Sequence, residues 1–260
     1  MQVQKTIDHI TGWMKDYLSK SGQKGFIVGV SGGIDSAVTS TLCATTGKPT
    51  LCVELPIHQH KSQVSRARKH IEHLEGRFAN VSSVKVDLSN TFDTFKSSLP
   101  ECDDKNLQDF SLANSRARLR MTTHYYFAGL HHYIVAGTGN KVEDFGVGFY
   151  TKYGDGGVDL SPIADLMKSE VFTLAEELCV IDEIQDAEPT DGLFGDSRTD
   201  EDQIGATYDE LEWAMTFEGE DSEIDDRQEK VLKIYNRLNA ANQHKMQPIP
   251  VCEIPDEYKS

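Results

Sequence analysis

The chain has 260 residues, a mass of 29.0 kDa and a formal net charge of -16, from 42 acidic and 26 basic residues. This acidic balance excludes non-specific binding to nucleic acid or to an anionic membrane as the main function. No stretch stays apolar over the roughly eighteen residues of a membrane helix, and the N-terminus lacks the apolar core of a secretory signal. We therefore expect a cytoplasmic protein with no membrane partner.

The length fits one large domain, residues 1–260, better than several small ones. No internal repeat, low-complexity tract or Pro/Gly/Ser-rich linker divides the sequence. The five cysteines are odd in number, widely spaced and without a C-x-x-C pair, which argues against a disulfide framework and a zinc ribbon. We expect inert thiols, with Cys179 in the core after a helical run.

Apolar residues first recur at helical spacing over residues 3–20, which predicts an amphipathic helix that ends at Gly22. Four short runs are then candidate strands: 26–30, 50–55, 84–88 and 133–136. Segments long enough for crossover helices separate them, so the pattern predicts an α/β fold with a mainly parallel sheet and helices on both faces. Further along, residues 182–203 are dense in Asp and Glu. They are expected to form a loop that is either simply solvated or a lid.

The segment FIVGVSGGIDSAV, residues 26–38, joins the first candidate strand to a helix expected from about Ser36. Backbone N–H groups in such a glycine turn and at the helix start can point at one anion. The segment is neither a Walker A loop nor a G-x-G-x-x-G fingerprint. Its aspartate, Asp35, either caps the helix or holds a metal ion that bridges to phosphate.

The string S-G-G-x-D-S after a first strand resembles the pyrophosphate loop of the N-type ATP pyrophosphatases, which cleave ATP between its α- and β-phosphates. The resemblance implies a Rossmann-like fold of the adenine nucleotide alpha hydrolase-like type. It also implies ATP as cosubstrate and Mg²⁺ held by Asp35. The implied ATP contacts in the loop are Gly29, Val30, Ser31, Gly32, Gly33, Ile34, Asp35 and Ser36.

Longer motifs narrow the choice within this superfamily. Residues 137–170, GTGNKVEDFGVGFYTKYGDGGVDLSPIADLMKSE, closely resemble the NAD synthetase signature. Three further segments resemble motifs of that family in the same order: NSRARLRM (114–121), EPTDGL (188–193) and QHKMQPIP (243–250). The resemblance spans nearly the whole chain and leaves no room for a glutaminase domain. It implies a stand-alone, ammonia-dependent ligase.

The implied reaction amidates nicotinic acid adenine dinucleotide (deamido-NAD) to NAD. The substrate carboxylate is first adenylated by ATP with release of pyrophosphate, and ammonia then displaces AMP. Other pyrophosphatase-type ligases, tRNA-modifying enzymes and a nucleotide-binding module without catalysis are the alternatives. A tRNA-modifying enzyme usually needs a basic surface and often paired cysteines, and the composition offers neither.

One departure concerns residues 137–143, which read GTGNKVE where the commoner short-form motif has G-T-D-H-A-A-E. Glu143 keeps its offset from Thr138, so it is carried over as the second Mg²⁺ ligand. Asn140 and Lys141 stay unassigned. The segment 58–68 matches less cleanly and makes Arg66 a candidate phosphate contact.

The resemblance assigns further roles residue by residue. Thr138, Lys168 and Thr190 correspond to ATP contacts, and Lys168, Thr190 and Asp155 to the catalytic group, with Asp155 near the adenylate and the incoming ammonia. Without the motif, Lys168 is an ordinary helix-start lysine and Asp155 a turn former. The implied deamido-NAD contacts are Asn114, Arg118, Lys152, Asp159, His244 and Lys245.

Two arginines of NSRARLRM, Arg116 and Arg120, share the other face of that helix. They form either a salt-bridging surface or part of a subunit contact. The family also implies a homodimer with the dinucleotide site near the subunit boundary.

Overall fold

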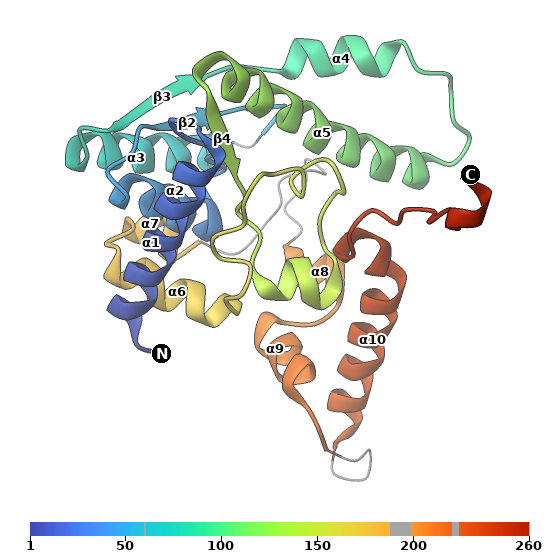
Figure 1. Cartoon of the computed structure of the whole chain (residues 1–260). Coiled ribbons are helices and arrows are strands. Elements are labelled where there is room, and N and C mark those ends of the chain that lie inside the picture. Colours follow the sequence, from blue (N-terminus) through green and yellow to red (C-terminus); the bar gives the residue numbers. More distant parts are fainter. Residues whose placement is uncertain (60, 188–198, 220–223, 260) are drawn as a thin grey trace.

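The computed structural model describes residues 1–59, 61–187, 199–219 and 224–259. Within these residues the centre is a parallel sheet in the order β3-β2-β1-β4 (Figure 1). The strands are β1 Gly25–Gly29, β2 Thr50–Glu54, β3 Val81–Lys85 and β4 Tyr133–Ala136. The predicted α/β fold with a parallel sheet is confirmed.

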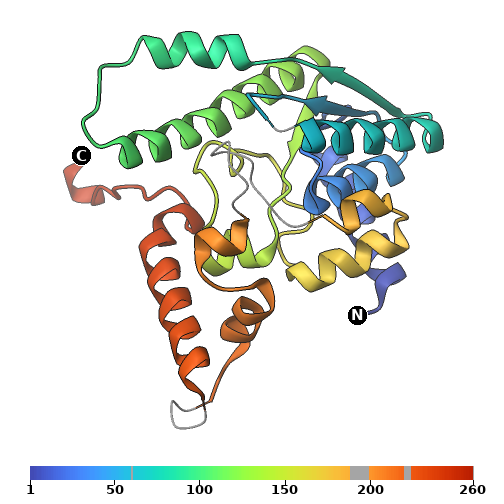
Figure 2. The ribbon, with the colours of Figure 1, turned by 180° about the vertical axis from the view of Figure 1, so that it is seen from behind.

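Two hydrophobic cores cover the two faces of the sheet. Alternate strand residues point to opposite faces, so Phe26 and Val28 enter one core while Ile27 enters the other. The first core is built with α1 Val3–Ser21, α2 Ile34–Thr45, α3 Lys61–Arg77, α6 Lys168–Glu177 and α7 Asp182–Gln185. The second core is built with α4 Ser89–Ser97 and α5 Lys105–His131, on the opposite side of the sheet in Figure 2.

A third core lies apart from the sheet. Its elements are the π-helix η1 Val142–Val147 and the helices α8 Asp200–Ile204, α9 Tyr208–Thr216 and α10 Asp226–Met246. These helices form the lower part of the molecule in Figure 1, and a short 3₁₀ turn, η3 Asp256–Tyr258, follows near the C-terminus. Because η1 follows β4 closely in the chain, this core lies beside the carboxyl end of the sheet.

The first predicted helix is confirmed: α1 ends at Ser21 and is capped by Gly22, whose φ of 69° is a conformation that favours glycine. The third strand is displaced from the prediction, since β3 covers 81–85 and not 84–88. Its register is set by β2, where Thr50 pairs with Val81. At a sheet edge, serine is tolerated on the exposed side, so the apolar pattern alone misplaced this strand.

The acidic stretch 182–203 is not simply a solvated loop. The helices α7 and α8 occupy its two ends, with Ile184 fully buried and a capping box between Thr199 and Asp202. The middle of the stretch, with the predicted contact Thr190 and the lid hypothesis, lies outside the described residues.

The cysteines divide by location. Cys43 and Cys52 are buried, whereas Cys102, Cys179 and Cys252 are exposed and all five are free thiols. The expectation that Cys179 lies in the core was wrong, because it follows the end of α6 at a φ of 54°. Among the described residues, no helix combines the length and the apolar character that crossing a membrane requires.

Candidate active site

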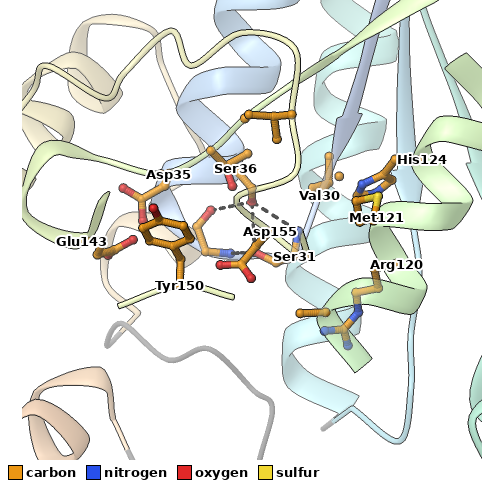
Figure 3. A pocket seen from close by; sticks show the side chains of 18 of the residues that line it. Val30, Ser31, Asp35, Ser36, Arg120, Met121, His124, Glu143, Tyr150 and Asp155 are labelled. Atoms are coloured by element: carbon orange, nitrogen blue, oxygen red, sulfur yellow. Dashed lines mark hydrogen bonds between the residues drawn. The ribbon is translucent and has the colours of Figure 1, made fainter. Parts of the chain in front are cut away.

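A cavity opens where the carboxyl ends of β1 and β4 meet. The chain leaves β1 toward β2 and β3 and returns to place β4 on the other side of β1, so the strand order reverses at this pair. Ligands of open α/β sheets bind at such a reversal. The loops after both strands line the cavity, together with α5 and the turn near Asp155 (Figure 3).

The loop after β1 is held in shape by its own serines. Its turn passes through Gly32 at a φ of 88°, where a side chain would be strained. The Ser31 amide donates to Ser36 Oγ at 3.2 Å, and Ser36 Oγ donates to the Gly33 carbonyl at 2.9 Å. This closes the turn and starts α2 at Ile34, beside the cavity. The first N–H groups of a helix have no partner within the helix, so the loop offers donors to an anion.

A lysine joins two carboxylates at one end of the cavity. Lys168 Nζ donates to Asp35 Oδ2 at 2.6 Å and to Glu143 Oε1 at 3.0 Å. The amide of Asn140 donates to Asp35 Oδ1 at 3.1 Å, and the Tyr208 hydroxyl donates to Glu143 Oε1 at 2.6 Å. Four elements of the chain therefore converge here: α2, the β4–η1 region, the start of α6 and the start of α9.

Burial and charge set the protonation of this group. Burial raises the pKa of Asp35, and Lys168 offsets only part of that rise. Burial acts the same way on Glu143, but Lys168 and the Tyr208 hydroxyl outweigh it and lower the pKa of that carboxyl. Burial alone would lower the pKa of Lys168, yet the two carboxylates hold it above its ordinary value. The lysine is a buried, charged ammonium, 3% exposed.

The donor set fits a hard divalent cation. The Lys168 ammonium already occupies a position between Asp35 and Glu143, so a positive charge there is favourable. Mg²⁺ usually takes one or two protein carboxylates together with phosphate oxygens and water. Two carboxylates beside a loop of backbone donors meet that requirement.

Three further carboxyl groups border the cavity, those of Asp144, Asp155 and Asp200. Asp155 accepts a hydrogen bond from the Thr151 amide at 3.0 Å, and burial raises its pKa to about 6 although its surface meets the open cavity. Burial raises the pKa of Asp144 to about 8. The Asp144 carboxylate lies over Gly139, where an added Cβ would be 2.2 Å from Oδ1. Gly139 therefore leaves the space that this carboxylate fills.

The opposite end of the cavity is more apolar. Val53, Leu55 and Met121 line it with His124, whose pKa burial lowers to about 4, so the imidazole is neutral at pH 7. Arg120 also lies here, as Figure 3 shows, and its Nε donates to the Leu55 carbonyl at 3.0 Å. Such a wall suits a flat heteroaromatic ring with polar edges.

The two arginines left open by the sequence have different surroundings. Arg120 lines the cavity, a position that the sequence did not predict for it. The Arg116 guanidinium stacks over the Phe92 ring at 4.7 Å, on the α4 side of α5.

Most of the predicted ATP contacts come together at the cavity. Its lining includes the predicted residues Gly29, Val30, Ser31, Gly33, Ile34, Asp35, Ser36, Thr138, Glu143, Asp155 and Lys168. Gly32 and Arg66 are not part of the lining. Arg66 Nε donates to the Gly32 carbonyl at 3.2 Å, so Arg66 supports the loop from behind.

The predicted dinucleotide contacts on α5 lie next to the loop 148–157. Asn114 Oδ1 accepts a hydrogen bond from Thr151 Oγ1 at 2.6 Å. Arg118 Nε and Nη2 both donate to the Lys152 carbonyl at 3.3 Å. These two side chains hold the loop and do not line the cavity.

Helix α10 forms hydrogen bonds with the same loop, residues 148–157, from the other side. Lys245 Nζ donates to the carbonyls of Gly148 at 2.7 Å and Tyr150 at 2.8 Å, and Lys152 Nζ donates to the His244 carbonyl. The His244 ring is exposed. We call this arrangement the α10 clasp.

The last predicted contact, Asp159, borders a separate hollow. Its carboxylate accepts hydrogen bonds from the Tyr125 hydroxyl at 3.0 Å and the Val135 amide at 2.8 Å. Trp13 and Tyr17 of α1 and Phe145 of η1 line that hollow with it. The predicted substrate residues therefore fall into two groups, the α10 clasp region and this aromatic hollow.

Sequence reasoning left out Asn140, Tyr208 and His124. Asn140 stands inside the motif, where the commoner form has histidine, and that difference was the only signal. Tyr208 follows the helix cap Thr207, and His124 lies on α5 like many core residues. Their roles depend on contacts between distant segments, which spacing along one sequence does not encode.

Comparison with known proteins agrees with this geometry. The family model described as NAD synthase matches residues 6–249. A curated relative, the NH(3)-dependent NAD(+) synthetase of Carboxydothermus hydrogenoformans, is 34% identical over 250 residues, which covers 95% of this chain and 96% of the relative.

Two solved structures are similar over their full length. The NMN synthetase from Francisella tularensis has a TM-score of 0.85 and 29% identity, covering 98% of this chain and 100% of that one. The NH3-dependent NAD synthetase from Campylobacter jejuni, in complex with the nitrate ion, has a TM-score of 0.75 and 25% identity, covering 97% and 100%.

Proposed function

The chain belongs to the NAD synthase family, and on that premise we propose that it amidates deamido-NAD with ammonia at the expense of ATP. It is a ligase that forms a carbon–nitrogen bond, and its substrates are small molecules. The observation that carries the proposal is the Lys168 ammonium between the carboxylates of Asp35 and Glu143, beside the loop after β1. We further propose that residues 1–260 act as one synthetase domain without a glutaminase domain.

The chemistry requires activation of a carboxylate. The substrate carboxylate attacks the α-phosphate of ATP, pyrophosphate leaves, and the acyl adenylate then accepts ammonia with departure of AMP. The loop Gly29–Ser36, with Thr138, would bind the phosphates through backbone and hydroxyl donors. Lys168 would stabilise the charge that develops on the leaving pyrophosphate. Thr190, outside the described residues, is proposed as a further phosphate contact.

Asp35 and Glu143 would hold Mg²⁺. The ion supplies charge neutralisation to the phosphates when bound. The chain's own part is to present two carboxylates at a fixed separation, with Asn140 and Tyr208 as hydrogen-bond donors to them. Lys168, which bridges the carboxylates here, would turn its ammonium toward the phosphates when the metal and ATP bind.

Asp155 would act on the nitrogen nucleophile. A carboxyl group whose pKa is about 6 is ionised at pH 7 and above, so it can attract ammonium and accept a proton from it. Only neutral ammonia has the lone pair that attacks the adenylate. Because Asp155 borders the same cavity as the loop Gly29–Ser36, both steps of the reaction have their groups within one space.

The acceptor would bind along the α10 clasp and the aromatic hollow. We propose Asn114, Arg118, Lys152, Asp159, His244 and Lys245 as its contacts, either directly or through the loop 148–157 that they hold. The aromatic side chains Trp13 and Tyr17 near Asp159 suit stacking against a base. We also propose a homodimer, since exposed residues such as Trp13 and Phe145 border this hollow.

A second candidate acceptor is nicotinic acid mononucleotide. The likeness to an NMN synthetase, with a TM-score of 0.85, favours it, since the same amidation of the mononucleotide gives NMN. The two acceptors share the reacting carboxylate and differ by one adenylate. The aromatic hollow is therefore relevant only to the dinucleotide.

One assay tests both candidates. Purified protein is supplied with ATP, Mg²⁺ and ammonium, and pyrophosphate release is measured with each acceptor in turn. Release that depends on deamido-NAD, with NAD and AMP as products, supports the proposal. A kcat/KM at least tenfold higher for nicotinic acid mononucleotide replaces it with the second candidate. Release that needs neither acceptor contradicts both.

A further inference from the structure

Tyr208 is the first residue of α9 and is almost fully buried, at 5% exposure. Thr207 caps the helix: its side chain accepts a hydrogen bond from the Glu210 amide, and Glu210 Oε2 accepts one from the Thr207 amide at 2.9 Å. This cap fixes the direction in which α9 starts. The Tyr208 amide donates to Glu201 Oε1 at 2.9 Å and ties the same point to α8.

The tyrosine side chain contacts both charges of the site. Its hydroxyl donates to Glu143 Oε1 at 2.6 Å, and its ring face lies 4.6 Å from Lys168 Nζ. Asp200 Oδ2 also lies 3.4 Å from the hydroxyl. A phenol on a carboxylate is a charge-assisted hydrogen bond, and an ammonium over a ring face is a cation–π contact. One side chain therefore orients a carboxylate and an ammonium that come from different elements.

Neither contact follows from packing alone. Tyr208 belongs to the third core with Leu211 and Ala214 of its own helix, and a phenylalanine would fill that core equally well. The hydroxyl is the only part of the side chain that needs a partner when buried; its short hydrogen bond goes to Glu143, and its contact with Asp200 is longer. Glu143 Oε1 in turn accepts from both Tyr208 and Lys168, so this one carboxylate oxygen is held by two donors.

We propose that Tyr208 is a positioning residue for the amidation site, acting through Glu143 and Lys168. The proposal rests on the proposed function for its catalytic readout. Tyr208 is not itself part of the cavity lining and, by this inference, contacts the lining residues Glu143 and Lys168 and not the substrates. Its hydroxyl orients the Glu143 carboxylate, which would hold the metal, and its ring positions the Lys168 ammonium, which would contact the phosphates. Partners that orient a metal-binding side chain typically change metal affinity or activity by about 10–100-fold when they are lost.

The test compares two matched hydroxyl deletions. Tyr208→Phe removes the hydroxyl and keeps the ring, and Tyr235→Phe makes the same change on α10, at the edge of the same core. Binding of Mn²⁺ to each protein with a non-hydrolysable ATP analogue is measured by electron paramagnetic resonance. We expect Mn²⁺ to bind at least about tenfold more weakly to Tyr208→Phe. Tyr235→Phe is expected to stay within about twofold of the wild type, because it contacts neither charge.

Turnover gives the second readout. The kcat of Tyr208→Phe should fall about tenfold or more, while the KM for the acceptor stays within about twofold, since the change acts on groups at the phosphates. Tyr208→Leu also removes the ring and should lower kcat further. If Tyr208→Leu does not fold, the Phe variant still decides the question.

A Tyr208→Phe protein with wild-type Mn²⁺ binding and wild-type kcat would overturn the proposal. If that protein also melts at a lower temperature, the hydroxyl is purely structural. If the wild type fails to turn over either acceptor, the proposed function fails, but the ratio of Mn²⁺ affinities still tests Tyr208.

Discussion

The Lys168 ammonium lies between two carboxylates that would otherwise repel each other. It comes from the first residue of α6, a position where lysine is normally solvated, and here it is 3% exposed. A buried pair of this kind is costly to break on one side, because the remaining charge loses its partner. The arrangement is thus a buried charged site in which one ammonium partly compensates two carboxylates from segments far apart in sequence.

Replacing Asp35 tests the carboxylate itself. Asp35→Asn keeps the size and can still accept the bond from Asn140, but the amide has no charge to offer a metal ion or Lys168. We expect ATP cleavage to fall by about 100-fold or more, which equals about 2.7 kcal/mol in the transition state. Steady-state kinetics at several Mg²⁺ concentrations measure this fall in the rate of ATP cleavage. Near-normal turnover at limiting Mg²⁺ would remove Asp35 from the metal site.

Asp155 makes stability depend on pH. Its pKa is raised by burial to about 6, so the folded protein holds the proton more tightly than the unfolded chain. The stabilising contribution is therefore present below about pH 4 and is lost as pH rises through about 6. Its surface meets the solvent of the cavity, so the effect is screened to about 1 kcal/mol or less.

The variant Asp155→Asn removes this dependence and keeps an oxygen for the Thr151 amide. Its melting temperature relative to the wild type should rise between pH 5 and pH 7 by about 2 °C. Thermal melts of both proteins in buffers of equal ionic strength measure the difference. A difference that does not change across this range contradicts the raised pKa.

At the scale of elements, the α10 clasp links a helix of the third core to the loop that carries Asp155. The Lys245 ammonium donates hydrogen bonds to two backbone carbonyls of that loop, at 2.7 and 2.8 Å. Hydrogen bonds from a charged donor contribute about 1.5–3 kcal/mol each, so Lys245 adds to the hold that Asn114 and Arg118 have on the other side of the loop. A contribution of Lys245 to acceptor binding would come from holding the loop 148–157 in place as well as from direct contact with the acceptor.

Removing that ammonium should loosen the loop. In Lys245→Met we expect faster amide hydrogen exchange over residues 148–157 and an increase of about tenfold or more in the KM for the acceptor, since a loss of about 1.4 kcal/mol is tenfold in affinity. Lys233→Met, on an exposed part of the same helix, is the matched control. Exchange that is equal in the two variants would show that the clasp does not hold the loop.

The sequence predicted the central strands and the loop after β1 because both depend on local patterns. Apolar runs of five residues and a glycine turn are visible without any partner segment. The edge strand β3 was displaced because its register comes from β2. The helices α7 and α8 at the two ends of residues 182–203 were not predicted, because the acidic composition hides the buried Ile184 and the helix cap at Thr199. Asn140 and Tyr208 were missed because their importance lies in contacts with Asp35 and Glu143.

At the scale of the whole molecule, the nitrogen source follows from the family to which the chain belongs. Hydrolysis of glutamine needs a nucleophile activated by a neighbouring base. Burial holds the pKa of the Cys43 and Cys52 thiols well above the ordinary value, so neither of these two is a ready thiolate. As a member of the NAD synthase family with NH(3)-dependent curated relatives, the chain is expected to use free ammonia.

The rate of NAD formation should rise with pH as ammonium loses its proton, until other groups titrate. Glutamine freed of ammonia should support less than about a tenth of that rate, because a weak thiol nucleophile contributes little without its base. Adding a separate glutaminase should restore it. If glutamine alone worked as well as ammonium, the ammonia-dependent assignment would be wrong even with the ATP chemistry intact.

The two carboxylates of the site are anchored in different hydrophobic cores. Asp35 belongs to α2, which packs on the sheet, whereas Glu143 belongs to η1, whose valines are part of the third core with Tyr208. The distance between the Asp35 and Glu143 carboxylates therefore depends on how the third core packs against the core on the sheet. A mild denaturant that loosens the smaller core would disperse the site while the sheet persists, so inactivation in urea should precede the loss of the far-ultraviolet circular dichroism signal. Loss of enzymatic activity in urea would then measure the loosening of the contact between the third core and the core on the sheet.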